Sequence, residues 1–115
     1  MADIILEIAN IEIKPGSCRE FIAAVERASS LLKRAKGCRG MELRQVIERP
    51  TLFQLLVQWD TVDNHMVDFQ GSHAFQEWRE QIGPFFATNP HVEHSVRRIN
   101  STWVADPAAA CNKNQ

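Results

Sequence analysis

The pattern of hydrophobic and polar residues predicts β-strands in four stretches of the chain, from β-branched residues in the first and from strict alternation in the second. The stretches are residues 4–13, 39–48, 52–59 and 91–99. Pro15 and Gly16 end the first stretch, and Arg49, Pro50 and Thr51 separate the second from the third. The second and third strands are therefore expected to form an antiparallel hairpin.

The first strand carries apolar residues on both of its faces. One face has Ile5, Glu7, Ala9, Ile11 and Ile13, and the other has Ile4, Leu6, Ile8, Asn10 and Glu12. A strand of this kind is usually covered on both sides, so both faces are expected to be buried over much of their length.

Helical spacing of apolar residues appears in the intervening segments. The first helix is expected to begin at Ser17, which forms a capping box with Glu20, and to end at Gly37. Its apolar stripe is Phe21, Ala24, Val25, Ala28, Leu31, Leu32 and Ala35.

Two further helices are expected between the third and fourth strands. A short one runs from Asp60 or Thr61 to Phe69. Ser72 caps the next, which Gly83 and Pro84 kink or end.

The order of these elements predicts an α+β protein with the ferredoxin-like β-α-β-β-α-β plan. Helices then cover one face of the sheet. The other face carries the apolar residues Ile4, Leu6, Ile8, Leu52 and Leu56. Because an apolar face of this size rarely stays in water, a second copy is expected to cover it, which predicts a homodimer. The domain is expected to span residues 1–100, with a tail at 101–115 that is flexible or docks on the partner subunit.

Composition narrows the function classes. The chain has 115 residues and a net charge of -1, so it is one domain without the basic excess that nucleic acid requires. It has no apolar run of the roughly 20 residues that a membrane helix needs. No basic segment precedes the first apolar run, so a cytoplasmic protein is expected. Three cysteines without a CxxC motif argue against a disulfide scaffold or a zinc site.

Several short motifs resemble one family. They are IEIKPG, KGCRGMEL, QWDTVDNHMVDFQGSHAFQEW and NPHVEHSV, in that order. Together they resemble the antibiotic biosynthesis monooxygenase family over about residues 4–99. The resemblance implies a dimeric α/β barrel. It implies oxidation of phenolic, quinol or polyketide-type aromatic substrates by molecular oxygen, with no cofactor and no metal.

The family also contains haem-degrading members, which this chain resembles less. Asn10 lies near the asparagine those members use, but Phe69 and Arg79 stand about where a tryptophan and an iron-ligating histidine belong. The cofactor-independent members place a tryptophan at the end of the third strand and an arginine about 20 residues later, as Trp59 and Arg79 do here. Their asparagine four residues before the tryptophan is Leu55 in this chain.

Such an oxygenase needs a proton acceptor, a donor to the oxyanion and an apolar chamber. His65 is expected to accept the proton, Arg79 to stabilise the oxyanion, and Trp59 to stack on the substrate. The residues expected to line the chamber are Asn10, Leu55, Phe69, Phe75, Trp78 and Phe86.

Structural explanations exist for the same residues. His65 could be an exposed residue near a helix start, Arg79 could pair with Glu77 or Glu80 at the surface, and Trp59 could be plain core. Two alternative functions therefore stay open. One is an isomerase or cyclase that uses the same pocket without oxygen, and the other is a non-catalytic ligand-binding dimer.

Overall fold

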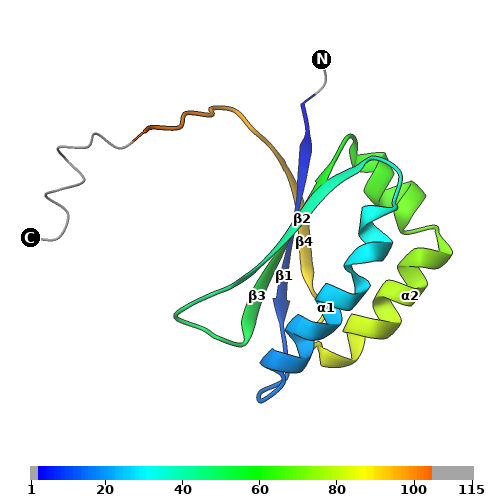
Figure 1. Cartoon of the computed structure of the whole chain (residues 1–115), viewed down its shortest axis with the longest axis vertical. Helices are drawn as coiled ribbons and strands as arrows, with labels where there is room; N and C mark the ends of the chain where they lie inside the picture. The colour runs from blue at the N-terminus through cyan, green and yellow to red at the C-terminus, as the bar shows by residue number, and fades with distance from the viewer. Residues whose placement is uncertain (1–2, 105–115) are drawn as a thin grey trace, which may run out of the picture.

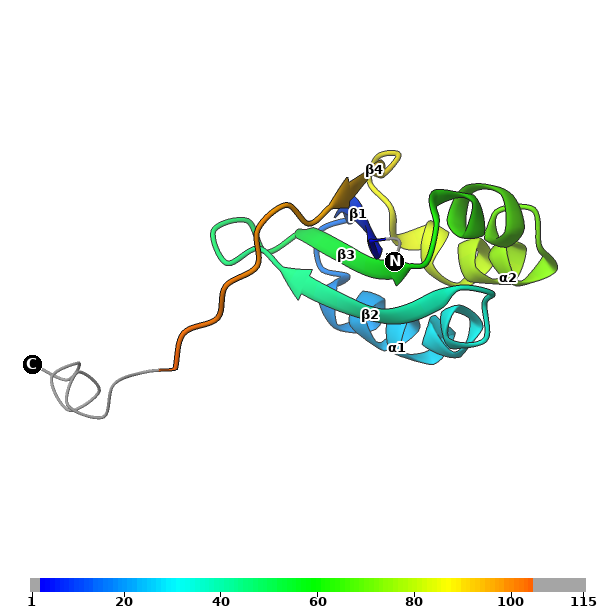
Figure 2. The same ribbon diagram turned by 90° about the horizontal axis from the view of Figure 1, so that it is seen from above.

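The structure is a computed structural model that describes residues 3–104. Its elements in chain order are β1 (Ile5–Glu12), α1 (Cys18–Lys33), β2 (Cys38–Gln45), β3 (Leu52–Trp59), the π-helix η1 (Asn64–Phe69), α2 (His73–Ile82), the 3₁₀ turn η2 (Gly83–Phe85) and β4 (His91–Val96). The four strands form one antiparallel sheet in the order β2-β3-β1-β4, with both α-helices on the same side (Figures 1 and 2). The ferredoxin-like α+β prediction is confirmed.

Two strands end earlier than the sequence predicts. β2 ends at Gln45 instead of residue 48, because the chain already turns there: the Arg49 N–H donates to the Val46 carbonyl at 3.3 Å. β4 ends at Val96 instead of residue 99. Val96 is paired with Ile5, the first residue of β1, so the neighbouring strand offers no further partner.

Helix starts were predicted with mixed success. Ser72 caps α2 as expected, because its hydroxyl accepts a hydrogen bond from the Phe75 N–H at 3.2 Å. The capping box at Ser17 is wrong, since the Ser17 side chain makes no capping hydrogen bond. Its backbone has φ -108° and ψ 8°, away from the extended conformation that an N-cap residue usually adopts. The short helix before α2 is a π-helix, a type that sequence periodicity does not reveal.

The hydrophobic core lies between the sheet and the helices. The apolar stripe of α1 is buried as predicted, apart from half-buried Ala35 beyond the helix end. Phe21 packs edge-on against Phe53 of β3, with ring centroids 4.9 Å apart. Contacts of this kind fix which side of β1 and β3 faces the helices.

The opposite face of the sheet is partly exposed and hollowed. The hollow is lined by Ile4, Leu6 and Leu56, with Arg97 and Arg98 at its edge.

After β4 the chain leads away from the sheet as far as residue 104, and the rest of the predicted tail lies outside the described residues (Figure 1). A single chain does not test the homodimer, which stays a prediction. No helix within residues 3–104 is long and apolar enough to cross a membrane.

Candidate active site

A buried carboxylate lies on the helix-facing side of β1. Glu7 is only 5% exposed and is paired with Val57 of β3 on one side and with His94 of β4 on the other. Directly paired residues of antiparallel strands point to the same face of the sheet. His94 therefore points toward the helices, whereas His91, which is paired with Asn10, points to the opposite face.

Trp59 and His65 complete the surroundings of this carboxylate. The indole N–H of Trp59, at the end of β3, donates to Glu7 Oε1 at 2.9 Å. His65 Nε2 lies 3.3 Å from the same oxygen. The imidazole is stacked on the indole, with ring centroids 5.3 Å apart and planes inclined by 19°. His65 is buried, so the reading that made it an exposed helix residue is wrong.

The second ring nitrogen of His65 also has a partner. His65 Nδ1 lies 2.8 Å from Nε2 of His94, which is half-buried. Glu7, His65 and His94 thus form a continuous line of hydrogen-bonding groups that runs from the interior toward the sheet edge. We refer to these three residues as the Glu–His–His row.

Local packing holds η1, and with it His65, against the sheet. The Asn64 N–H donates to Thr61 Oγ1 at 3.0 Å, and the Asn64 amide donates to Asp68 Oδ2 at 3.1 Å. The buried Asn64 side chain fills the space beside Gly37, which has a φ of +78°. A side chain at Gly37 would be strained and would also overlap Asn64.

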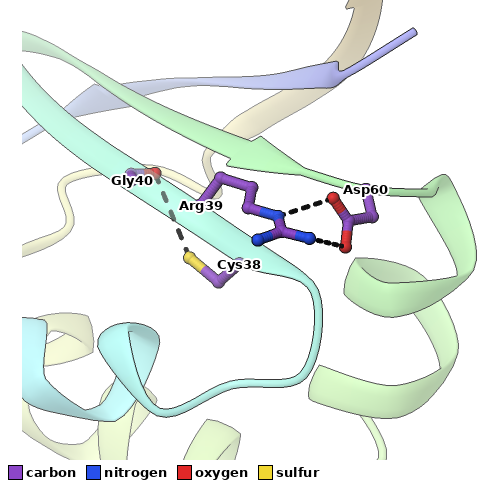
Figure 3. Close-up of polar contacts among 4 residues, drawn as sticks. All are labelled: Cys38, Arg39, Gly40 and Asp60. Carbon is purple, nitrogen blue, oxygen red and sulfur yellow. Dashed lines mark hydrogen bonds and ion pairs between the residues drawn. The ribbon is translucent and has the colours of Figure 1, made fainter. Parts of the chain in front are cut away.

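A bidentate ion pair joins the strand ends near the row. Arg39 at the start of β2 donates to both carboxylate oxygens of Asp60, at 2.7 and 3.0 Å (Figure 3). The pair raises the pKa of Arg39 and lowers that of Asp60. Because both groups are at the surface, the pair adds little to stability. Asp60 also donates its backbone N–H to the Gly37 carbonyl at 2.8 Å.

Burial shifts the pKa values within the row in opposite directions. It raises the pKa of Glu7 to about 7, and the hydrogen bond from Trp59 opposes that rise. Burial, followed by the nearby His94, lowers the pKa of His65 to about 4. The Glu7–His65 distance would also suit an ion pair, but burial disfavours both charged forms. We therefore interpret it as a polar contact between the carboxyl group of Glu7 and a neutral imidazole.

Cys38, which lies near Glu7, favours the protonated thiol over a reactive thiolate. Cys38 is half-buried at the start of β2 and lies near Gly40 (Figure 3). Burial raises the pKa of its thiol, the contact with the Gly40 carbonyl opposes this, and nearby Glu7 adds to it. The protonated thiol is thus favoured, in line with packing.

Arg79 does not contact the row. It is exposed, and its guanidinium carbon lies 5.9 Å from the centroid of the Phe75 ring. Phe75 contacts Phe69, which in turn contacts Trp59. Two aromatic rings therefore stand between Arg79 and Trp59. Arg79 makes no ion pair within residues 3–104, and the carboxylate of Glu77 lies against His73 instead.

The residues predicted to line one chamber are distributed over several places. Leu55, Trp78 and Phe69 are buried in the core. Phe86 lines an open surface cleft together with Arg79. Asn10 is on the opposite face of the sheet from the row, where its amide oxygen accepts a hydrogen bond from Gln54 at 3.1 Å. The structure thus brings Trp59, His65 and Phe69 together, with Phe75 next to them, and leaves Asn10 apart.

Sequence reasoning missed Glu7 and His94 as site residues. Only Glu7 left a signal in the sequence. Glu7 is the only charged residue on a strand face that otherwise consists of Ile5, Ala9, Ile11 and Ile13. The strand pairing that sets His94 beside Glu7 joins segments far apart in the chain and is not contained in either segment alone.

Comparison with known proteins places the chain in a family. The model of the antibiotic biosynthesis monooxygenase family matches residues 4–81. The chain belongs to this family. An uncharacterized Bacillus subtilis protein, YczJ, is 33% identical over 91 residues, which are 79% of this chain and 96% of that protein. The matched family segment contains Glu7 and His65 but ends before His94.

Solved structures agree with the antibiotic biosynthesis monooxygenase assignment. A Bordetella bronchiseptica protein, provisionally named as an antibiotic biosynthesis monooxygenase, is 46% identical, with a TM-score of 0.83 over 84% of this chain and 99% of that chain. A Caulobacter crescentus protein with the same provisional name has a TM-score of 0.73 at 18% identity, over 85% and 92% of the two chains. The second likeness concerns the fold alone. The family supports a general monooxygenase-like activity and does not specify the substrate.

Proposed function

We propose that this antibiotic biosynthesis monooxygenase family protein is a cofactor-independent monooxygenase that acts, as a homodimer, on a small phenolic, quinol or polyketide-type aromatic substrate. The observation that carries the proposal is the 2.8 Å contact between His65 Nδ1 and His94 Nε2. It connects a buried, neutral imidazole to one that reaches the sheet edge. The second imidazole can act as a general base.

The proposed chemistry begins with loss of a substrate proton to the row. The resulting carbanion or phenolate reduces molecular oxygen, and the peroxide that forms on the ring then loses water. For a ring methylene the overall change is CH₂ + O₂ → C=O + H₂O. Oxygen accepts the four electrons that the carbon loses, so no further reductant is required.

His94, and not His65, is the group that meets the substrate in this proposal. His65 is 4% exposed, and both of its ring nitrogens already face partners within the protein. His94 uses one ring nitrogen for His65 and is half-buried, so its other nitrogen can serve as the acceptor. Trp59 is fully buried and gives its N–H to Glu7, so we assign it to positioning instead of substrate stacking.

Oxygen uptake tests the proposal. Metal-free protein is mixed with hydroquinones, anthrones and naphthols, and wild type is compared with His94→Gln. Loss of the base is expected to lower uptake by about 10²-fold or more. His73→Gln is the matched control, because His73 lies exposed on α2 and away from the row. Uptake that is equal in both variants would remove His94 from the reaction.

An isomerase or cyclase is the second candidate, and a specific observation favours it. The row offers the base that proton transfer without oxygen requires. Such an enzyme would convert the substrate at an equal rate with and without oxygen. A protein that binds these aromatics but changes none of them would instead be a non-catalytic ligand-binding dimer.

A further inference from the structure

We propose that Glu7 is the terminal proton acceptor of the Glu–His–His row: the proton enters at His94, and both imidazoles pass it inward by exchanging tautomers. This inference rests on the proposed function for the source of the proton. The relay itself is a property of the row and can be observed without a substrate.

With Glu7 ionised, the contacts assign one direction to every hydrogen bond. The carboxylate can only accept, so in the proposed relay His65 carries its proton on Nε2, which lies 3.3 Å from Glu7 Oε1. A neutral imidazole carries one N–H, so His65 Nδ1 must accept. It accepts the Nε2–H of His94 across 2.8 Å. The outer Nδ1 of His94 is then bare and can take a proton.

Transfer of one proton along the row exchanges donor and acceptor at each contact between its residues. The substrate O–H or C–H bond breaks and an Nδ1–H bond forms on His94. His94 loses its Nε2 proton to His65 Nδ1, and His65 loses its Nε2 proton to Glu7. Afterwards Glu7 donates to His65 Nε2 and His65 donates to His94 Nε2. Every partner is again satisfied, and both imidazoles are neutral before and after the transfer.

The surroundings of Glu7 explain why the proton stops there. His65 of η1, His94 of β4 and the Cys38 thiol of β2 are the titratable groups that lie near it, and Trp59 of β3 offers its N–H. No lysine or arginine forms an ion pair with Glu7 within residues 3–104. An isolated buried carboxylate favours its protonated form, and burial raises the pKa of Glu7 to about 7. The pKa of His65 is lowered to about 4, so the proton does not rest there.

The same burial limits where the proton can go next. Glu7 is 5% exposed, so release to water through its own side chain is blocked. The stored proton returns through His65 and His94 to the peroxide oxygen, whose departure as water requires it. Glu7 does not touch the substrate in this scheme and acts through the two imidazoles.

Nitrogen NMR of the histidine rings tests the relay directly, because it reports which ring nitrogen carries the proton. In substrate-free wild type, His65 and His94 are expected to change together from Nδ1–H to Nε2–H as pH rises, with a midpoint near the Glu7 pKa of about 7. Glu7→Gln is expected to abolish the change. Glu12→Gln, which alters another glutamate of β1, is expected to leave it intact. Formation of an imidazolium at His65 with the same midpoint would overturn the relay. Because this result is read from the wild-type protein, it tests the relay even if Glu7→Gln does not fold.

The outcomes separate the relay from the proposed function. A tautomer change without oxygen uptake on any substrate would retain the relay and reject the oxygenase. Uptake that depends on His94 while Glu7→Gln keeps full turnover and an unchanged pH profile would retain the oxygenase and reject Glu7 as the acceptor.

Discussion

His65 Nδ1 lies 2.8 Å from His94 Nε2, although the two residues are 29 positions apart in the chain. Two features produce this contact. The register of β1 with β4 places His94 beside Glu7, and the stacking of His65 on Trp59 places the second imidazole against both. The candidate base is therefore built by the sheet and completed by η1.

Replacement of Glu7 by glutamine is expected to change how stability depends on pH. The pKa of Glu7 rises from 4.5 to about 7 in the folded chain. Its favourable contribution to the free energy of unfolding is therefore fully present below pH 4.5 and is lost as pH rises to about 7. His65 acts in the opposite sense: its pKa falls from 6.5 to about 4, so its contribution is lost as pH falls through that range. The two effects largely cancel in the wild type between pH 4.5 and 6.5.

Urea unfolding across this pH range measures the effect. As pH rises from 4.5 to about 7, the free energy of unfolding of Glu7→Gln is expected to increase by about 3 kcal/mol relative to that of wild type. Parallel curves for the two proteins would mean that Glu7 titrates normally in the fold.

Gly37→Ala is expected to displace Asn64 and with it the start of η1. Gly37 and Gly16 both have positive φ, 78° and 81°, but only Gly37 has a side chain pressed against it. Gly16→Ala should cost about 1–2 kcal/mol from backbone strain alone. Gly37→Ala should cost at least about 1 kcal/mol more because of the overlap. Equal losses in thermal or urea unfolding would show that Asn64 moves freely.

Arg79→Ala tests the role expected of this guanidinium from the sequence. If the Arg79 guanidinium, which lies over the Phe75 ring, stabilises an oxyanion, turnover should fall about 10²-fold in Arg79→Ala. Arg79→Lys keeps the charge but loses the forked donors and should recover only part of the activity. Steady-state rates with a substrate found in the oxygen-uptake panel give the answer, and an unchanged rate in Arg79→Ala would remove this residue from the mechanism.

Leu6→Glu tests the predicted homodimer. Leu6 lies on the face of the sheet opposite the helices and lines the hollow there with Ile4 and Leu56. A buried, unpaired charge at this position should dissociate a dimer that covers the face. Ile47→Glu is the control, since Ile47 is 88% exposed in the turn after β2. Sedimentation should show a monomer for Leu6→Glu alone, and a dimer for both variants would mean that the interface lies elsewhere.

The fold was largely predictable, because each element has a local signal. β-Branched residues identify β1, alternation identifies β2, and the stripe of α1 has clear helical spacing. The strand ends at Gln45 and Val96 were less predictable, since they depend on where the chain turns and where a neighbouring strand begins.

The candidate site was predictable only in part. His65 and Trp59 were identified from the sequence and lie in contact. Asn10 lies on the sheet face that alternation assigns to it, opposite the row, and its role in substrate binding stays a prediction. Glu7 and His94 acquire their roles through tertiary pairing and burial, which no local pattern contains.

The most direct measurement is anaerobic mixing of wild type and His94→Gln with a substrate whose anion absorbs at longer wavelength than its neutral form. Without oxygen the deprotonated substrate cannot react further. The Glu–His–His row should therefore make the anion accumulate in wild type and not in His94→Gln, and admission of oxygen should then consume it. Equal anion formation in both proteins would contradict the assignment of the row as the base.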